Sequence, residues 1–272
     1  MLEQRQALLR LLGDDDPATV DLVKTQLSQA GAESLPELQI LLHEANPAAA
    51  LQLRDVIAEI EERDAAAIFG DFCTNFDEQV TLEDAVWRLA AAFSPGDAFV
   101  EPRQLLDKWG AEVARRLRKA STALDRVETL SEYLSEEVRL RGNEEDYYNL
   151  DNSLLPQVIE SGLGIPISLS IVYILVARRA GLWLEGVGLP GHFMVRHEEI
   201  FFDPFHGGCR VSLDECRALM RQQNLTLRSE HLLAATPRQI LLRALTNIYY
   251  VAERNDPVLA AKVADWIGSL RS

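Results

Sequence analysis

The sequence predicts an α+β protein that is mainly helical, with one small antiparallel sheet packed on a buried central helix. Over most of the chain, apolar residues recur every three to four positions, which is typical of amphipathic helices. Residues 162–182 are apolar on nearly every side, so we expect this helix to be buried. Residues 182–203 instead show a period of two with glycines at the turns, which favours short strands.

Residues 1–68 are expected to form a succession of short helices. Asp16-Pro17 and Asn46-Pro47 each place a capping side chain before a proline at the first helical position. The repeated device predicts a HEAT-like helical extension over residues 1–70. This segment carries more acidic than basic residues. Two interpretations fit that excess of acidic residues: it keeps the segment soluble, or it forms an acidic face that binds a partner.

The rest of the chain alternates helices with one strand-rich insert. Helical periodicity continues over residues 77–140, and the polar, aromatic segment 143–149 is expected to be a structured loop before a short helix at 153–160. In the buried helix, Pro166 suits the first turn and Gly181 the end. After the predicted strands, residues 212–272 return to helix behind capping motifs.

The composition excludes several classes of protein. The chain has 272 residues and a net charge of −15, which argues against general nucleic-acid binding because phosphate contacts need a basic surface. Its longest apolar run, Ile165–Ala177, is shorter than the ~20 residues that span a bilayer. Met1–Leu12 lacks the apolar core of a signal peptide. We therefore expect a cytoplasmic protein with no membrane contact, whose three cysteines are reduced thiols.

Lys108–Lys119 is a basic stretch within this acidic chain. Two interpretations fit it: a solvated helix face balanced by nearby acidic residues, or a site for an acidic partner.

Three residues form a candidate site for acyl-transfer chemistry. Ser168 lies near the start of the buried helix, where free backbone N–H groups can hold an oxyanion. His192 begins one predicted strand and Asp203 ends the next. Their separation suits the two arms of a hairpin, which would place the carboxylate beside the imidazole and fix its tautomer.

The order of these motifs resembles the transglutaminase-like superfamily, and more closely its bacterial SirB-type branch, which joins such a module to tetratricopeptide-like helices. The matching strings are Gly142-Asn143, Tyr148, Asn152-Ser153, Gly164–Ser170, Gly188–Phe193, Asp203–Phe205, Pro237–Arg243 and Asn247. The resemblance implies a papain-like or transglutaminase-like core over residues 71–228 and a truncated tetratricopeptide-like helical region over 229–272.

In the superfamily, a cysteine at the helix start precedes the histidine and the aspartate. Residues 162–182 contain no cysteine, and Ser168 stands at or near its position, with Pro166 and Ser170 as the alternatives. A serine hydroxyl is a weak nucleophile without strong activation. The resemblance therefore implies a degenerate site in a non-catalytic, protein-binding or regulatory module.

Other functions stay open at this point. A hydrolase or acyltransferase would use Ser168, His192 and Asp203 on an amide or ester, or Cys209 as a relocated thiol. A third hypothesis is an adaptor that binds through the acidic helices of residues 1–68.

Cofactors and metals are not expected. His192, His197, Asp203 and His206 offer ligand atoms, but His192 and His197 would face opposite sides of one strand. Tyr148 and Asn152 are expected to line the cleft. A protein partner is predicted, and the sequence does not indicate the oligomeric state.

Overall fold

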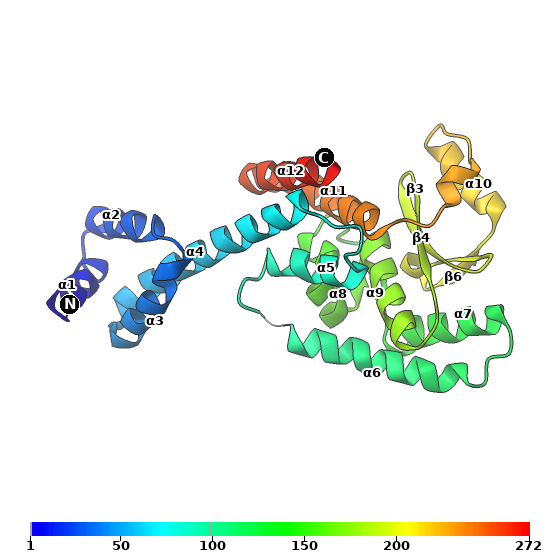
Figure 1. Ribbon diagram of the computed structural model, residues 1–272, viewed down its shortest axis with the longest axis horizontal. Coiled ribbons are helices and arrows are strands. Elements are labelled where there is room, and N and C mark those ends of the chain that lie inside the picture. The colour runs from blue at the N-terminus through cyan, green and yellow to red at the C-terminus, as the bar shows by residue number, and fades with distance from the viewer. Residues whose placement is uncertain (1, 98) are drawn as a thin grey trace. The chain divides into compact units, whose positions relative to one another are not determined.

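The computed structural model describes residues 2–97 and 99–272 (Figure 1). The described chain is mainly helical and divides into two compact units. The first unit contains the described residues up to Phe72 together with Ala91–Asp97. The second contains Cys73–Ala90 and the described residues from Phe99 onward. The candidate site lies entirely in the second unit.

The first unit is a set of helices around its own apolar core. Its helices are α1 (Leu2–Leu12), α2 (Pro17–Ser28), α3 (Leu35–Glu44) and α4 (Pro47–Thr74) as far as Phe72. Asp16 caps α2 by accepting the backbone N–H of Ala18, and Asn46 accepts that of Ala49 at 2.9 Å, as the two proline motifs predict. The core contains Leu12, Leu38, Leu41, Leu53, Val56 and Ile60. Helix α4 runs for 28 residues, where the sequence suggested shorter helices.

The second unit contains the remaining helices. They are α5 (Leu82–Ala91), α6 (Val100–Leu117), α7 (Ala123–Glu132), α8 (Leu155–Ser161), α9 (Pro166–Arg179), α10 (Leu213–Gln222), α11 (Pro237–Asn255) and α12 (Pro257–Arg271). Every residue of α9 from its first proline to Ala177 is buried. It packs against α6 on one side and against the sheet on another (Figure 1). This is the buried central helix that the sequence predicts.

The sheet packed on α9 has four antiparallel strands in chain order. They are β3 (Glu185–Leu189), β4 (His192–His197), β5 (Ile200–Asp203) and β6 (Cys209–Val211). The apolar alternation indicates the first three, and β6 is a short addition at the edge. A second, parallel pair joins β1 (Arg141–Gly142) to β2 (Leu163–Gly164) and ties the loop after α7 to the start of α9.

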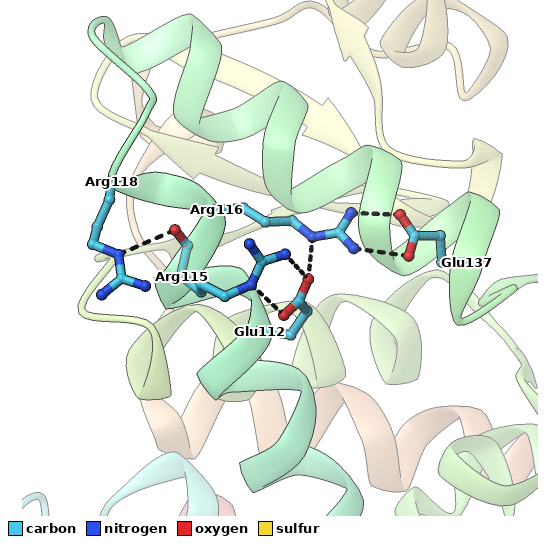
Figure 2. Close-up of polar contacts among 5 residues, drawn as sticks. All are labelled: Glu112, Arg115, Arg116, Arg118 and Glu137. Carbon is cyan, nitrogen blue, oxygen red and sulfur yellow. Dashed lines mark hydrogen bonds and ion pairs between the residues drawn. The ribbon is translucent and has the colours of Figure 1, made fainter.

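Two arginines of the basic stretch, Arg115 and Arg116 on α6, are paired with acidic residues (Figure 2). Arg115 donates to both oxygens of Glu112, and Arg116 donates to Glu112 at 2.7 Å and to Glu137 at 2.8 Å. The hydrogen bonds from Arg115 and then Arg116 lower the pKa of Glu112 to about 2. These contacts support the interpretation of a solvated, internally paired helix face.

None of the described helices combines the length and the apolar content needed to cross a bilayer.

Candidate functional site

A tight turn sets the position of His192. Leu189 pairs with His192 across the β3–β4 hairpin, which leaves Pro190 and Gly191 as a two-residue loop. Gly191 has φ +79°, a conformation that glycine adopts without strain. His192 is thereby fixed as the first residue of β4, at the end of the sheet where β5 finishes in Asp203.

His192 and Asp203 form a hydrogen-bonded pair. The Nε2 atom of His192 lies 2.6 Å from Oδ2 of Asp203, so the ring donates to the carboxylate. Asp203 is buried, with 4% of its surface exposed, and His192 is largely buried. The structure thus brings together the two residues that the hairpin spacing placed side by side.

Asp203 accepts two further hydrogen bonds. His206, which follows in the turn Pro204–His206, donates from Nδ1 to Oδ2 at 2.7 Å, and the backbone N–H of Phe205 donates to Oδ1 at 2.9 Å. Burial alone would raise the pKa of Asp203, but the hydrogen bonds and charges of His192 and His206 outweigh it and hold the pKa below its usual value. Asp203 is therefore an ionised carboxylate at neutral pH.

The Ser168 hydroxyl forms hydrogen bonds with the backbone around it. Its Oγ accepts the N–H of Ile165 at 3.0 Å and lies 2.5 Å from the carbonyl oxygen of Asn152, to which the hydroxyl donates. The carbonyl of Ile165 is a second acceptor at 3.1 Å. Only 2% of the Ser168 surface is exposed. The hydroxyl proton is thus directed at a backbone carbonyl, and no hydrogen bond joins Ser168 to His192.

The three thiols lack the features of activated nucleophiles. Catalytic cysteines have lowered pKa values, because a nearby cation or helix N-terminus stabilises the thiolate. Burial raises the pKa of Cys73 to about 12 and also raises that of Cys216. Cys209 is exposed on β6, opposite Asp203. Partial desolvation of its thiol, and next the negative charge of Asp203, raise the pKa of Cys209 too.

The His192–Asp203 pair offers a general base, the His192 ring, but no nucleophile in the part of the chain that the structure describes is hydrogen-bonded to that ring. Because His192 donates from Nε2, its neutral ring carries a lone pair on Nδ1 that can take up a proton. Among the described residues, Nδ1 makes no hydrogen bond to a hydroxyl or a thiol. The arrangement can orient an imidazole and accept a hydrogen bond from a ligand.

Three of the four candidate metal ligands lie close together. The ligand atoms of His192, Asp203 and His206 are within 4.8 Å of one another. His197 is separate: its Nδ1 donates to the carbonyl of Trp183 at 2.9 Å. Both rings of the cluster donate to the same carboxylate oxygen, so hydrogen bonds account for their convergence. Zinc would require unprotonated nitrogens about 2.0–2.1 Å from the ion.

The two predicted cleft residues have different surroundings. Tyr148 is half exposed and lines a pocket of about 400 Å³ that reaches Gly191, the residue before His192. Asn152 is buried and is not among the residues that line that pocket. Its side-chain amide donates to the carbonyl of Asp146 at 2.6 Å and accepts from Asn143 at 2.9 Å. Asn152 therefore braces the loop that carries Tyr148.

Sequence reasoning missed two residues near the pair. The sequence indicates His206 only as a candidate metal ligand, although its position three residues after Asp203 in a Pro-containing turn favours a local hydrogen bond. Tyr173, on α9, is fully buried. Burial, and next the negative charge of the nearby Asp203 carboxylate, raise the pKa of the Tyr173 phenol. Its hydroxyl has no hydrogen-bond partner among the described residues. The helical pattern identifies Tyr173 only as a core residue.

A comparison with models of protein families agrees with the mainly helical fold with small sheets. The model of the transglutaminase-like superfamily matches residues 101–246, more than half of the chain. The chain therefore belongs to the transglutaminase-like superfamily.

Curated relatives include several bacterial proteins named UPF0162 protein. A UPF0162 protein of Xylella fastidiosa is 37% identical over 153 residues, which cover 52% of this chain and 54% of the relative. One from Pseudomonas aeruginosa is 30% identical over 203 residues, which cover 71% of this chain and 72% of the relative. The chain thus spans about half the length of the Xylella protein.

A shorter similarity extends to eukaryotes. F-box only protein 21 of mouse is 33% identical over 108 residues, which cover 35% of this chain and 17% of that protein. No solved structure matches the chain.

Proposed function

We propose that this protein is a non-catalytic member of the superfamily that uses the cleft beside His192 to bind a protein partner. The observation that carries the proposal is the hydrogen bonding of Ser168. Its hydroxyl caps the start of α9 and donates to Asn152, while the His192–Asp203 pair stands without a nucleophile. A fold that hosts enzymes also hosts binding modules, so the site decides between them.

The proposal includes the finer family assignment. We place the chain in the SirB-type branch, with a papain-like core over residues 71–228. We also infer that residues 229–272 are a truncated tetratricopeptide-like region. The packing of α11 against α12, two consecutive helices of that region, supports this inference.

The alternative is a serine-dependent hydrolase or acyltransferase. It would require the Ser168 side chain to leave two backbone partners and turn toward His192. Since a hydroxyl does not ionise near neutral pH, it would also need His192 as a general base within hydrogen-bond reach. The raised pKa of Cys209 weighs against a thiol in its place.

Site-resolved labelling tests the proposal. The purified protein is treated separately with a fluorophosphonate and with iodoacetamide, and adducts are mapped by peptide mass spectrometry. We expect Ser168 to stay unlabelled and the thiols to react no faster than a free cysteine. Fluorophosphonate on Ser168 that disappears in a His192→Ala variant would establish an activated serine and overturn the proposal. Fast, His192-dependent alkylation of Cys209 would overturn it as well.

A further inference from the structure

Arg243, on α11, is a half-buried arginine without an acidic partner. Among the described residues its guanidinium makes neither an ion pair nor a hydrogen bond, and the ionisable groups that influence it are the phenols of Tyr147 and Tyr250. Burial lowers the pKa of Arg243, yet an arginine in a protein stays charged at neutral pH. A partly desolvated charge without a counter-ion is costly, and folding alone gives no reason to keep it.

Two arginines of the same burial class in this unit are paired with carboxylates, whereas Arg103 and Arg178 lie over tryptophan rings instead. Arg179, whose side chain is 19% exposed, donates to Glu83 and to Asp107, each at 2.6 Å. Arg196, 22% exposed, forms an ion pair with Glu185. The chain has 42 acidic residues against 27 basic ones, so carboxylates are plentiful. Glu230 lies in the lining of a second pocket that Arg243 also borders, but no carboxylate of the described residues pairs with Arg243, which points to a partner from outside the chain.

Arg243 lines the pocket of about 400 Å³ beside the His192 turn. Such a volume lies within the range of about 300–1,000 Å³ that is usual for ligand sites. Tyr147, Tyr148 and Tyr250 contribute to its walls, and no aspartate or glutamate does. Arg254 also lines it, with its guanidinium 4.0 Å from the centre of the Tyr148 ring.

The pocket lies next to the candidate site. Its lining includes Gly191, which precedes His192, and Ile165, whose backbone N–H is bonded to Ser168. A ligand seated on Arg243 would therefore extend toward His192. The inference that follows rests on the proposed function, because it names what the cleft recognises.

We propose that this pocket binds a peptide segment of a partner protein through a carboxylate that pairs with Arg243, between walls of tyrosine. The planar fork of a guanidinium matches the two oxygens of a carboxylate. The tyrosine rings offer stacking surfaces to the neighbouring part of the peptide. The carboxylate comes either from an acidic side chain or from a chain terminus, and both present the same group to the arginine.

The first experiment uses benzoate and its neutral isostere benzamide with the chain of 272 residues. Binding is followed by NMR of the arginine side chains. We expect saturable binding of benzoate at Arg243, with benzamide at least about tenfold weaker. Arg243→Gln should weaken benzoate binding at least about tenfold, and Arg243→Lys should retain part of it. Arg126→Gln, which removes the same charge from an exposed position on α7, is the matched control and should bind like the wild type.

The second experiment identifies the source of the carboxylate. Random octapeptides are selected by display on the wild type and on Arg243→Gln, in separate libraries with free and with blocked C-termini. Enrichment of glutamate and aspartate in both libraries indicates a side chain, and enrichment only with free C-termini indicates a chain end. Either enrichment pattern supports the proposal if it is absent from the selection on Arg243→Gln.

Stability separates a ligand role from a structural one. Because Arg243 has no partner in the fold, Arg243→Met should melt at the same temperature as the wild type or higher. A large loss of melting temperature would show that the arginine supports the fold and would overturn the proposal. Equal binding of benzoate and benzamide, or acidic enrichment that survives Arg243→Gln, would overturn it too.

The same samples keep this inference distinct from the proposed function. Mass spectrometry of the selected peptides after incubation reports whether they are cleaved or deamidated. Processing that depends on Arg243 would refute the non-catalytic role and leave the carboxylate site standing. Intact peptides without any Arg243-dependent binding would refute the carboxylate site alone.

Discussion

At the scale of single residues, the side chains of Ser168 and Asp203 have different roles: one bonds to the backbone, and the other orients the histidine of the candidate site. Ser168 is bonded to the backbone of Ile165 and Asn152, so its hydroxyl organises the start of α9. Asp203 is bonded to two imidazoles, so its carboxylate orients His192. Substituting each residue should therefore change a different property of the protein.

Ser168→Ala should lower the free energy of unfolding by about 1–2 kcal/mol, because the variant loses a cap and leaves buried backbone groups unpaired. Urea denaturation provides the measurement. Ser161→Ala is a suitable control, since that exposed hydroxyl also donates to a backbone carbonyl, at 2.7 Å from Gln157. The control should change stability by less than about 0.5 kcal/mol. Equal effects of the two substitutions would contradict a capping role for Ser168.

Asp203→Asn should destabilise the protein by about 1.5–3 kcal/mol at neutral pH, because two imidazoles lose a charged acceptor. The folded state lowers the pKa of Asp203, so its contribution is present above the unfolded value near 3.9 and is lost as the pH falls through the lower folded value. Urea denaturation between pH 7 and pH 2.5 should show the difference between variant and wild type shrinking below pH ~4. A difference that is constant across this range would contradict the ionised pair.

Tyr173→Phe should leave stability unchanged or raise it by up to about 1 kcal/mol. The Tyr173 hydroxyl is buried without a hydrogen-bond partner among the described residues, so removing it relieves an unmet desolvation cost. Thermal melting checks this expectation. A loss of more than ~1 kcal/mol would mean that the hydroxyl has a partner, such as bound water.

The sequence could predict the His192–Asp203 contact because a hairpin fixes which residues are neighbours. It could not predict where the Ser168 hydroxyl points. Its acceptor is the carbonyl of Asn152, 16 residues earlier, which reaches Ser168 only through the packing of a loop on the start of α9. A helix position alone leaves the direction of a side chain undetermined.

At the scale of elements, the β3–β4 turn controls the site. Gly191 has φ +79°, and a Cβ there would lie 3.0 Å from the side-chain nitrogen of Gln223. Gly191→Ala should cost about 1–2 kcal/mol and displace His192. Denaturation together with the NMR signals of the His192 ring would measure both effects. An unchanged ring environment would show that the turn does not position the histidine.

Elements with capping residues and long periodic patterns were predictable, whereas short pairings were not. Asp16 and Asn46 mark the starts of α2 and α4 because their side chains satisfy backbone N–H groups locally. Strands β1 and β2 have two residues each, too few to show a period of two. They exist because Arg141 and Gly142 meet Leu163 and Gly164 in the folded chain.

At the scale of the whole molecule, the described chain divides into two compact units, which contain different optical probes. All four tryptophans (Trp87, Trp109, Trp183 and Trp266) belong to the second unit, while both units contribute helix to far-UV circular dichroism. Urea unfolding should therefore give a single fluorescence transition and a circular dichroism curve that does not coincide with it. Coincident transitions would mean that the units unfold together.

In the adaptor hypothesis, the acidic first unit would bind the partner. Its ion pairs include Arg5 with Glu37 and Lys24 with Asp55, which are partly exposed and contribute little to stability. The candidate site lies in the second unit, together with the pocket that Arg243 lines. Partner binding that survives changes at Arg243 and is lost with the first unit would favour the adaptor.

The most direct test of a site without a nucleophile is to place a cysteine at position 168. In Ser168→Cys, the rate of alkylation at residue 168 is measured against pH by peptide mass spectrometry, with and without His192→Ala. We expect slow alkylation that does not depend on His192, because the side chain points at the backbone of Asn152. Fast alkylation below pH 7 that His192→Ala abolishes would show a thiolate–imidazolium pair. That result would contradict the non-catalytic geometry and return Ser168 to the position of a nucleophile.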